Sequence, residues 1–196
     1  LVDAAGPNGS KARHGLGHTR WATHGAVTEQ NAHPLTGCDA NEIAIVLNGI
    51  VENYRELREE LTTAGHQFTS ETDAEVVVHL LEMEYEGDLA AALARVYTRL
   101  EGHFTIVAIH HDQPDVLAGV RCQTPLVVGI GVGENFLASN VAAFLSETKR
   151  AVFPDDGEIV EIRPEAVRFF KDGSEVEHPE VEELEWDDES AEKAGY

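Results

Sequence analysis

The sequence predicts an α+β fold in which sheets are sandwiched by helices, and three observations support this prediction. A continuous apolar run at residues 43–47 is suited to a strand buried on both faces. Stretches between residues 53 and 100 carry apolar positions with the period of amphipathic helices. From residue 103 onward the pattern changes to short strands separated by turn signals. Buried strands among amphipathic helices are typical of layered α+β domains.

The composition fits one globular domain with a large excess of acidic residues. The chain has 196 residues, 42% of them hydrophobic, which allows a sizeable core and argues against disorder. Its 36 acidic and 14 basic residues give a formal net charge of −22. Such a charge repels nucleic acids and anionic membranes, so we expect neither as a partner. An acid-rich, lysine-poor surface indicates a halophilic protein, because high salt screens self-repulsion.

The first part of the chain is expected to be irregular up to a single buried strand. Residues 1–14 are polar and rich in turn formers, which is typical of a loop or a frayed terminus. The predicted strand at residues 42–49 ends with Asn48 and Gly49, a pair that by itself could form a hairpin turn. A helical pattern follows this pair, however, rather than a second alternating strand.

The first predicted helix starts after Asn53, which can act as its N-cap. Leu57, Leu61 and Ala64 would form its buried stripe. Gly65 is expected to end the helix, since glycine adopts the left-handed conformation that closes many helices.

The second predicted helix begins with a capping box formed by Thr72 and Glu75. Asp73 falls in its first turn, where the helix dipole alone would favour an acidic residue. A third helix is expected over residues 88–100. The apolar positions of the second helix are Val76, Val77, Leu80, Leu81 and Met83.

The second half of the chain is predicted to be mostly strands. The glycines at positions 129, 131 and 133 could suggest a nucleotide-binding loop, but no capped helix follows them, so a turn between strands is expected. Asp172 and Gly173 predict a hairpin. The expected strands are 104–110, 116–120, 126–130, 135–138, 158–162 and 166–170.

These elements place one domain at residues 1–174, followed by an acidic linker at residues 175–196. The sequence has no recognisable signal peptide and no apolar run long enough to cross a bilayer. Its two cysteines, Cys38 and Cys122, cannot form a multi-bridge framework and suit a reducing compartment. We therefore expect a cytoplasmic location.

Polar groups are most concentrated in residues 18–34, which contain an arginine, a tryptophan, hydroxyls and three histidines. Each of these residues could be structural when taken alone, but packing does not require them together. His18, His24 and His33 are potential metal ligands. Their spacing matches no common zinc pattern, so no metal site and no cofactor are predicted. Binding of a small polar ligand is the remaining reading of this segment.

Five motifs carry a resemblance to a known family. They are residues 19–25 (TRWATHG), 31–34 (NAHP), 48–53 (NGIVEN), 70–75 (SETDAE) and 133–139 (GENFLAS). In this order and wording they resemble the glutaminase domain of the glucosamine-6-phosphate synthase family, within the class II (N-terminal nucleophile) glutamine amidotransferases. The resemblance covers nearly the whole chain.

The resemblance implies a fold, a reaction and partners. The fold would be an N-terminal-nucleophile hydrolase-type sandwich of antiparallel sheets flanked by helices. The reaction would release ammonia from L-glutamine to convert fructose 6-phosphate into glucosamine 6-phosphate. The sugar-isomerase domain, which is not in this chain, would bind fructose 6-phosphate, and the full-length protein would be a homodimer.

The resemblance also assigns site residues. Arg20 would hold the α-carboxylate of glutamine, a task suited to the bidentate guanidinium, and Asp73 would hold the α-ammonium group. The side-chain amide of Asn48 and the backbone N–H of Gly49 would form the oxyanion hole. The remaining residues implied in the substrate site are Trp21, Thr23, His24, Gly25 and His33.

The family's nucleophile is an N-terminal cysteine whose own α-amine serves as the base. This chain begins with Leu1, and neither Cys38 nor Cys122 has a free α-amine. We expect the domain to be N-terminally truncated, and the chain alone to bind glutamine weakly or not at all and not to hydrolyse it. Two alternatives stay open: the glutaminase part of another class II enzyme such as amidophosphoribosyltransferase, and a non-catalytic glutamine-binding module.

Overall fold

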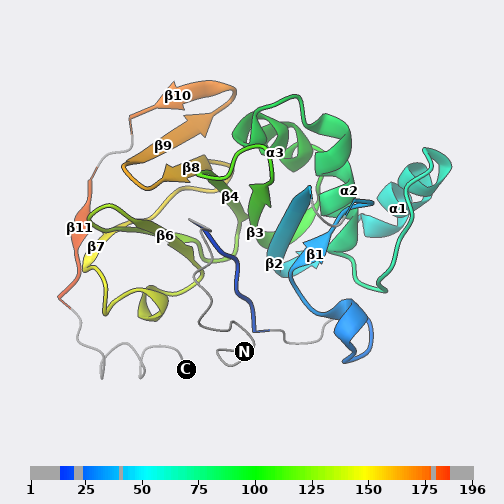
Figure 1. The fold of residues 1–196 in the computed structure, drawn as a ribbon, viewed down its shortest axis with the longest axis horizontal. Coiled ribbons are helices and arrows are strands. Elements are labelled where there is room, and N and C mark those ends of the chain that lie inside the picture. Colours follow the sequence, from blue (N-terminus) through cyan, green and yellow to red (C-terminus); the bar gives the residue numbers. More distant parts are fainter. Residues whose placement is uncertain (1–13, 20–23, 40–41, 178–179, 186–196) are drawn as a thin grey trace.

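Two antiparallel sheets form the centre of the computed structural model, which describes residues 14–19, 24–39, 42–177 and 180–185 (Figure 1). The first sheet has the strand order β1-β2-β3-β4-β8-β9-β10 and the second the order β11-β7-β5-β6. The strands of the first sheet are β1 (Leu35–Thr36), β2 (Ile43–Val51), β3 (Gly102–His110), β4 (Leu117–Cys122), β8 (Ile159–Arg163), β9 (Ala166–Lys171) and β10 (Ser174–Val176). Those of the second are β5 (Val127–Ile130), β6 (Asn135–Ala138), β7 (Arg150–Val152) and β11 (Glu182–Glu183).

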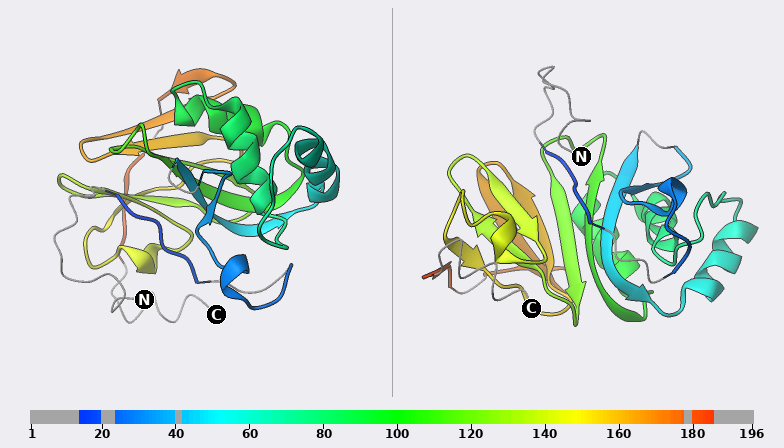
Figure 2. Two further views of the ribbon diagram at one scale, coloured as in Figure 1. Left: turned by 45° about the vertical axis from the view of Figure 1, so that its right-hand side comes forward. Right: turned by 90° about the horizontal axis from the view of Figure 1, so that it is seen from below.

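Three α-helices lie between β2 and β3 in the chain: α1 (Tyr54–Thr63), α2 (Glu75–Glu84) and α3 (Leu89–Tyr97). Helices α2 and α3 pack against the first sheet, and α1 packs against α2 (Figures 1 and 2). Two short 3-10 helices, η1 (Glu29–Asn31) and η2 (Val141–Ala143), complete the described elements. The arrangement confirms the predicted combination of sheets and helices.

The core is divided by the first sheet into separate apolar clusters. Between this sheet and the helices lie residues such as Leu80, Phe104 and Ile106, all fully buried. Between the two sheets lie Val128 and Val160, which are also fully buried. A third cluster packs under η2 on the second sheet. Burial on both faces explains why β3 reads as a continuous apolar run.

Strand β2 only partly follows the expectation of burial on both faces. Ile45 is fully buried against the helices, whereas Val46, which points to the other face, is half-buried against the cluster between the sheets. The strand also continues through Asn48 and Gly49 to Val51, pairing with β3 throughout, so the alternative of a hairpin turn at this pair is wrong.

The bounds of the first helix are close to those predicted, but two details are wrong. Asn53 does not cap α1 with its side chain. The side-chain amide of Asn53 instead donates to the carbonyl of Arg99 and accepts from the N–H of Glu101. These two bonds join the start of α1 to the residues that follow α3, so the amide is not available as a cap. Ala64 is exposed instead of buried. Leu57 and Leu61 form the buried stripe as predicted.

The second helix begins at Glu75, so the predicted capping box with Thr72 is wrong. The carboxylate of Glu75 reaches back further and accepts from the backbone N–H groups of Thr69 (2.7 Å) and Ser70 (2.8 Å). Met83, predicted as an apolar face position, is 47% exposed and so is not part of the buried face. The third helix is confirmed, with the side chain of Asp88 accepting from an N–H in its first turn.

All of the predicted strands are present. Gly131 and Gly133 lie in the turn between the antiparallel strands β5 and β6, as expected, whereas Gly129 belongs to β5 itself. Asp172 and Gly173 both have positive φ and connect β9 to β10, which confirms the hairpin. The short strands β1, β7 and β11 were not predicted, since two or three residues carry too little pattern.

The described part of the segment predicted to be a linker contributes to both sheets. Val176 pairs with Phe169, and Glu182–Glu183 pairs with β7. Leu184 is 9% exposed and belongs to the third cluster. The domain boundary at residue 174 stays a prediction. Among the described residues, no helix is long and apolar enough to cross a membrane.

Candidate functional site

A cavity of about 350 Å³ opens where β2, the segment before η1 and the segment before α2 meet. It gathers five of the residues implied in the site by resemblance: His24, His33, Asn48, Gly49 and Asp73. Its lining consists of His18, Thr19, His24, His33, Leu47, Asn48, Gly49, Thr72, Asp73 and Ala74. The predicted site residues Arg20, Trp21 and Thr23 lie outside the described residues.

Asn48 is held by a hydrogen bond to a histidine from a distant segment. The Nε2 atom of His18 donates to the side-chain oxygen of Asn48 at 2.6 Å. The rings of His18 and His33 are in contact, with their centroids 4.3 Å apart. His33 in turn accepts from the backbone N–H of Leu47 through Nδ1, at 3.3 Å. Two of the three histidines considered as metal ligands are therefore engaged with β2.

Gly49 occupies a position that only glycine can fill. Its φ is +113°, a conformation that L side chains rarely adopt. A Cβ atom at this position would lie 2.0 Å from the carbonyl oxygen of His103 on β3. Because Gly49 has no side chain, the backbone of β2 itself lines the cavity at this point, next to the amide of Asn48.

Asp73 presents a buried carboxylate to the cavity. It is 3% exposed, and its Oδ2 accepts from the N–H of Val51 at 2.7 Å. Its Oδ1 lies 3.5 Å from Nδ1 of His24. Asp73 precedes α2 instead of lying in its first turn, so its carboxylate faces β2 and His24. The interpretation of Asp73 as an acid favoured only by the dipole of helix α2 therefore does not account for its position.

The turn that carries Asp73 is fixed by Glu75. Besides the two N–H groups, Glu75 accepts from the hydroxyls of Thr69 (2.9 Å) and Ser70 (2.8 Å). Burial of the Glu75 carboxyl opposes ionisation, but contacts with His79, Thr69 and Ser70 lower its pKa to about 2. The carboxylate is therefore ionised at neutral pH and can hold the turn.

A second buried side chain, Asn31, joins the loop after His24 to the same turn. Asn31 is 2% exposed; it donates to the carbonyl of Ala26 at 2.9 Å and accepts from the N–H of Glu71 at 2.9 Å. Gly25, a predicted site residue, does not line the cavity but lies against Asn31. A Cβ at Gly25 would be 2.7 Å from the Nδ2 atom of Asn31.

A second cavity of about 490 Å³ adjoins the first and extends between the two sheets. It shares His18, Thr19 and Asn48 with the first cavity and is otherwise largely apolar. Both cysteines lie elsewhere. Cys38 is exposed beyond β1, and Cys122 donates to the carbonyl of Gly102. Neither is therefore placed to attack a ligand at Asn48.

Sequence reasoning missed three residues that shape this site. His18 was weighed only as a metal ligand, Asn31 only as part of a motif, and Glu75 only as a helix cap. Asn31 and Glu75 both lie within the motifs quoted for the resemblance, at 31–34 and 70–75, and this was the available signal. The partner of His18 is 30 residues away, so no local pattern could reveal it.

Comparison with known proteins places the chain in a family. Residues 18–146 match the glutamine amidotransferase domain. The chain belongs to this family. The match spans β2, all three helices and the strands up to η2, and so includes every residue that lines the first cavity.

Two curated relatives of this amidotransferase domain carry the same name. Glutamine–fructose-6-phosphate aminotransferase [isomerizing] from Aquifex aeolicus is 46% identical over 196 residues, which is 100% of this chain and 33% of the relative. The protein of the same name from Streptomyces coelicolor is 51% identical over 185 residues, 93% of this chain and 30% of the relative. The chain thus spans about a third of the length of these relatives.

Solved structures of similar fold confirm the predicted architecture. Glutamine phosphoribosylpyrophosphate amidotransferase from B. subtilis superposes with a TM-score of 0.65 at 21% identity, covering 79% of this chain and 34% of that one. A structure described as the allosteric regulatory enzyme of purine biosynthesis gives a TM-score of 0.63 at 22% identity, with the same coverage of both chains. The domain therefore has the N-terminal-nucleophile amidotransferase sandwich.

Proposed function

We propose that this domain binds L-glutamine and releases ammonia from it, as the glutaminase part of a glutamine–fructose-6-phosphate aminotransferase (isomerising). The observation that supports this most is the convergence of Asn48, Gly49 and Asp73 on one cavity. The cavity combines a side-chain amide, a glycine backbone N–H and a buried carboxyl group. An amino-acid amide needs these three kinds of group for recognition and for attack at its side chain.

The amino-acid end of glutamine would lie against Asp73. This carboxylate is buried and ionisable, so it can pair with the α-ammonium group in a site of low dielectric. Arg20 would hold the α-carboxylate through a bidentate pair of hydrogen bonds. Thr19 and His24, which stand on either side of the undescribed residues 20–23, both line the cavity, and this supports the assignment. Trp21 and Thr23 are proposed as further members of the pocket, whereas Gly25, which lies against Asn31, would act by shaping the loop that carries His24.

The side-chain amide of glutamine would lie against Asn48 and Gly49. His18 donates to the oxygen of Asn48, so the NH₂ group of Asn48 is the part that can donate to a developing oxyanion. The N–H of Gly49 would be the second donor. Each such donor lowers the barrier by about 3 kcal/mol in well-studied acyl-transfer enzymes.

The nucleophile is proposed to be a cysteine thiolate that is not among the residues of this chain. Its sulfur would attack the amide carbon of glutamine, the amide nitrogen would take up the proton that the thiol had given to its base, and the carbon–nitrogen bond would break to release ammonia and leave a thioester. Water would then hydrolyse the thioester to glutamate. Cys38 and Cys122 lie away from the cavity, so the 196-residue chain alone is expected to release no ammonia.

The wider reaction is proposed from the relatives. Ammonia would pass to fructose 6-phosphate on an isomerase domain of a longer, cytoplasmic, homodimeric protein. The amidophosphoribosyltransferase alternative is less well supported, because those structures are only 21–22% identical to this chain while the curated aminotransferases cited above are 46–51% identical. The identity of the amino sugar formed distinguishes the two.

The decisive experiment uses the whole protein encoded by the gene from which this chain comes. Glutamate release from glutamine would be measured for the parent, Asn48→Ala and Asp73→Asn, with Asp172→Asn in the distant hairpin as the control. We expect N48A to lower kcat by roughly 10²–10³-fold and D73N to raise KM. Parental kinetics in both variants, or product formation from phosphoribosyl pyrophosphate instead of fructose 6-phosphate, would overturn the proposal.

A further inference from the structure

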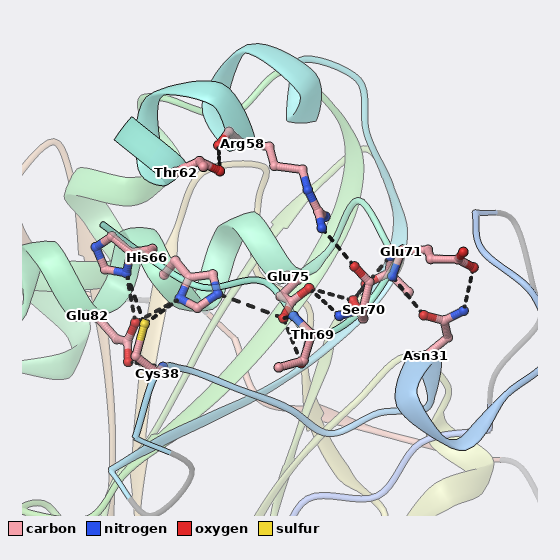
Figure 3. Close-up of polar contacts among 12 residues, drawn as sticks. Asn31, Cys38, Arg58, Thr62, His66, Thr69, Ser70, Glu71, Glu75 and Glu82 are labelled. Atoms are coloured by element: carbon pink, nitrogen blue, oxygen red, sulfur yellow. Dashed lines mark hydrogen bonds and ion pairs between the residues drawn. The ribbon is translucent and has the colours of Figure 1, made fainter. Parts of the chain in front are cut away.

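Away from the glutamine cavity, four side chains from three segments converge on one point (Figure 3). Cys38 follows β1, His66 follows α1, and His79 and Glu82 lie one turn apart on α2. Each contributes one ligand atom, and these four atoms lie within 4.8 Å of one another. Within the residues that the structure describes, no other set of three or more such ligands converges in this way.

The distances between these atoms match those between the ligands of a tetrahedral zinc ion. The Sγ atom of Cys38 lies 3.5 Å from Nδ1 of His66 and 3.7 Å from Nδ1 of His79. Zn–S and Zn–N bonds of about 2.3 and 2.1 Å at the tetrahedral angle place sulfur and nitrogen about 3.6 Å apart. Both imidazoles therefore already stand at ligand distance from the thiol.

The carboxylate of Glu82 completes the set. Its Oε2 lies 3.2 Å from Nδ1 of His66 and 2.8 Å from Nδ1 of His79. Nitrogen and oxygen ligands of zinc are about 3.4 Å apart for bonds near 2.1 Å. Coordination thus requires His79 and Glu82 to separate by only about half an ångström.

A supporting carboxylate stands behind His79. This side chain is 1% exposed, and its Nε2 lies 3.9 Å from Oε1 of Glu75, with no hydrogen-bond partner among the described residues. Glu75 itself is fixed by the groups of Thr69 and Ser70. Metal-bound histidines commonly direct their second nitrogen at a carboxylate, which orients the ring. The cluster therefore has an orienting group as well as ligands.

The loop after β1 is shaped around the Glu82 carboxylate. The N–H of Cys38 donates to Oε1 of Glu82, the oxygen that does not face the histidines. A Cβ atom at Gly37 would lie 2.0 Å from the same oxygen, so this close approach depends on glycine. The backbone thereby fixes which oxygen of Glu82 is turned toward the sulfur and the two nitrogens.

We propose that Cys38, His66, His79 and Glu82 form a binding site for one Zn²⁺ ion. Thiolate and imidazole ligands favour zinc over magnesium or calcium, which take oxygen ligands. One thiolate and one carboxylate balance the charge of the ion. Four protein ligands close the coordination shell, as in structural rather than catalytic zinc sites. From the sequence, only His18, His24 and His33 were candidate metal ligands, so this group was missed.

The ion would join the loop after β1 to helix α2. This loop follows His33 and α2 follows Asp73, two residues that line the glutamine cavity, so a metal at this point would tie together the parts of the chain that come directly after them. The inference does not depend on the proposed glutaminase activity, because the cluster lies outside that cavity. Its readouts are metal content and stability.

The test uses the full chain freed of metal with a chelator and then titrated with Zn²⁺ or Co²⁺. Parent, Cys38→Ser and His66→Gln would be compared with Cys122→Ser, which removes the other cysteine without touching the cluster. We expect one zinc per chain in the parent and in C122S, a higher thermal midpoint with zinc, and a thiolate-to-cobalt charge-transfer band with Co²⁺. C38S should lose this band, and both C38S and H66Q should lose more than about 100-fold in affinity, since outer-shell groups alone are worth 10–100-fold.

A second variant tests the site without removing a ligand. Glu75→Gln keeps the size of the side chain and should weaken zinc binding by about 10–100-fold while the cobalt band is retained. Circular dichroism at matched temperature shows that each variant is folded. The proposal is overturned if the metal-free parent binds less than one zinc per chain at micromolar concentration, or if C38S and C122S bind zinc equally.

Discussion

The Nε2 atom of His18 donates a 2.6 Å hydrogen bond to the side-chain oxygen of Asn48, across 30 residues of sequence. This contact fixes which end of the Asn48 amide faces the cavity. It also links the segment before residue 20 to strand β2, so the orientation of one proposed oxyanion donor depends on a residue outside the strand. His18 is therefore a positioning residue in the proposed reaction.

Replacement of His18 by alanine should lower kcat for glutamine hydrolysis in the whole protein by about tenfold, part of the roughly 10²–10³-fold that loss of a complete oxyanion donor costs. KM should change little, because His18 is not proposed to touch the amino-acid end. His18→Gln, which can still donate to Asn48, should restore most of the rate. A merely structural role would instead move kcat and thermal stability together in both variants, whereas His111→Ala at an exposed site should change neither.

Replacement of Gly49 by alanine should destabilise the chain by more than the 1–3 kcal/mol typical of backbone strain. The new Cβ would meet the backbone oxygen of His103 at 2.0 Å, besides adopting a φ of +113°. Gly65→Ala is the matched control, because Gly65 has a φ of +102° and open space around it. The free energy of unfolding in urea would be measured for both. Equal losses of unfolding free energy in G49A and G65A would contradict this prediction, because they would show that the backbone moves to accommodate the new Cβ at position 49.

Replacement of Asn31 by alanine should cost about 1–3 kcal/mol, because this buried side chain accepts from the N–H of Glu71 and donates to the carbonyl of Ala26, and both hydrogen bonds would be lost. The loop at residues 24–31 should then become more accessible to protease and to amide exchange, and KM for glutamine should rise. Gln30→Ala, one residue away and exposed, should leave all three quantities unchanged. Protection of the loop in N31A equal to that of the parent would contradict this prediction.

The stability of the chain should fall in mild acid partly because of His110. Burial lowers the pKa of this imidazole below 6.5, although Asp112 and Glu42 act in the opposite direction and His111 in the same one. His110 stacks on Tyr85, with ring centroids 3.6 Å apart, and its Nδ1 accepts from the N–H of Asp112, which requires the neutral form.

The sign of the effect follows from proton binding. Below pH 6.5 the unfolded chain binds a proton at this histidine before the folded chain does, so stability is fully present above pH 6.5 and is lost as the pH falls. The slope cannot exceed about 1.4 kcal/mol per pH unit. Urea unfolding at pH 7.5 and 5.5 should show a smaller loss for His110→Gln than for the parent. Identical losses would assign the acid sensitivity to other groups.

The sequence predicted the layers of the fold because long elements carry their own pattern. The helices at 54–63, 75–84 and 89–97 and the strands from residue 102 onward have enough apolar positions to fix type and approximate bounds. Caps failed where a side chain had a better tertiary partner. Asn53 pairs with the end of the α3 segment, and Glu75 reaches Thr69 and Ser70 instead of Thr72.

The site was less accessible to sequence reasoning. Asn48, Gly49 and Asp73 came from the resemblance, and the shared cavity around them became visible only with the fold. From the local pattern alone, Asn48 and Gly49 could either form a hairpin turn or lie within a strand, and the structure shows that β2 continues through them. The cluster of Cys38, His66, His79 and Glu82 spans 45 positions of sequence with no conventional spacing, so only tertiary structure could bring it together.

Helix α2 starts two residues after Asp73 and carries His79 and Glu82 on the side that faces the β1 loop. Each residue added to or removed from a helix turns everything beyond it by about 100°. An insertion or deletion between positions 73 and 79 would therefore leave Asp73 in the cavity and rotate His79 and Glu82 away from Cys38. The length of this segment is as constrained as its chemistry, and related genes should vary in length elsewhere, for instance in the exposed connection between α2 and α3.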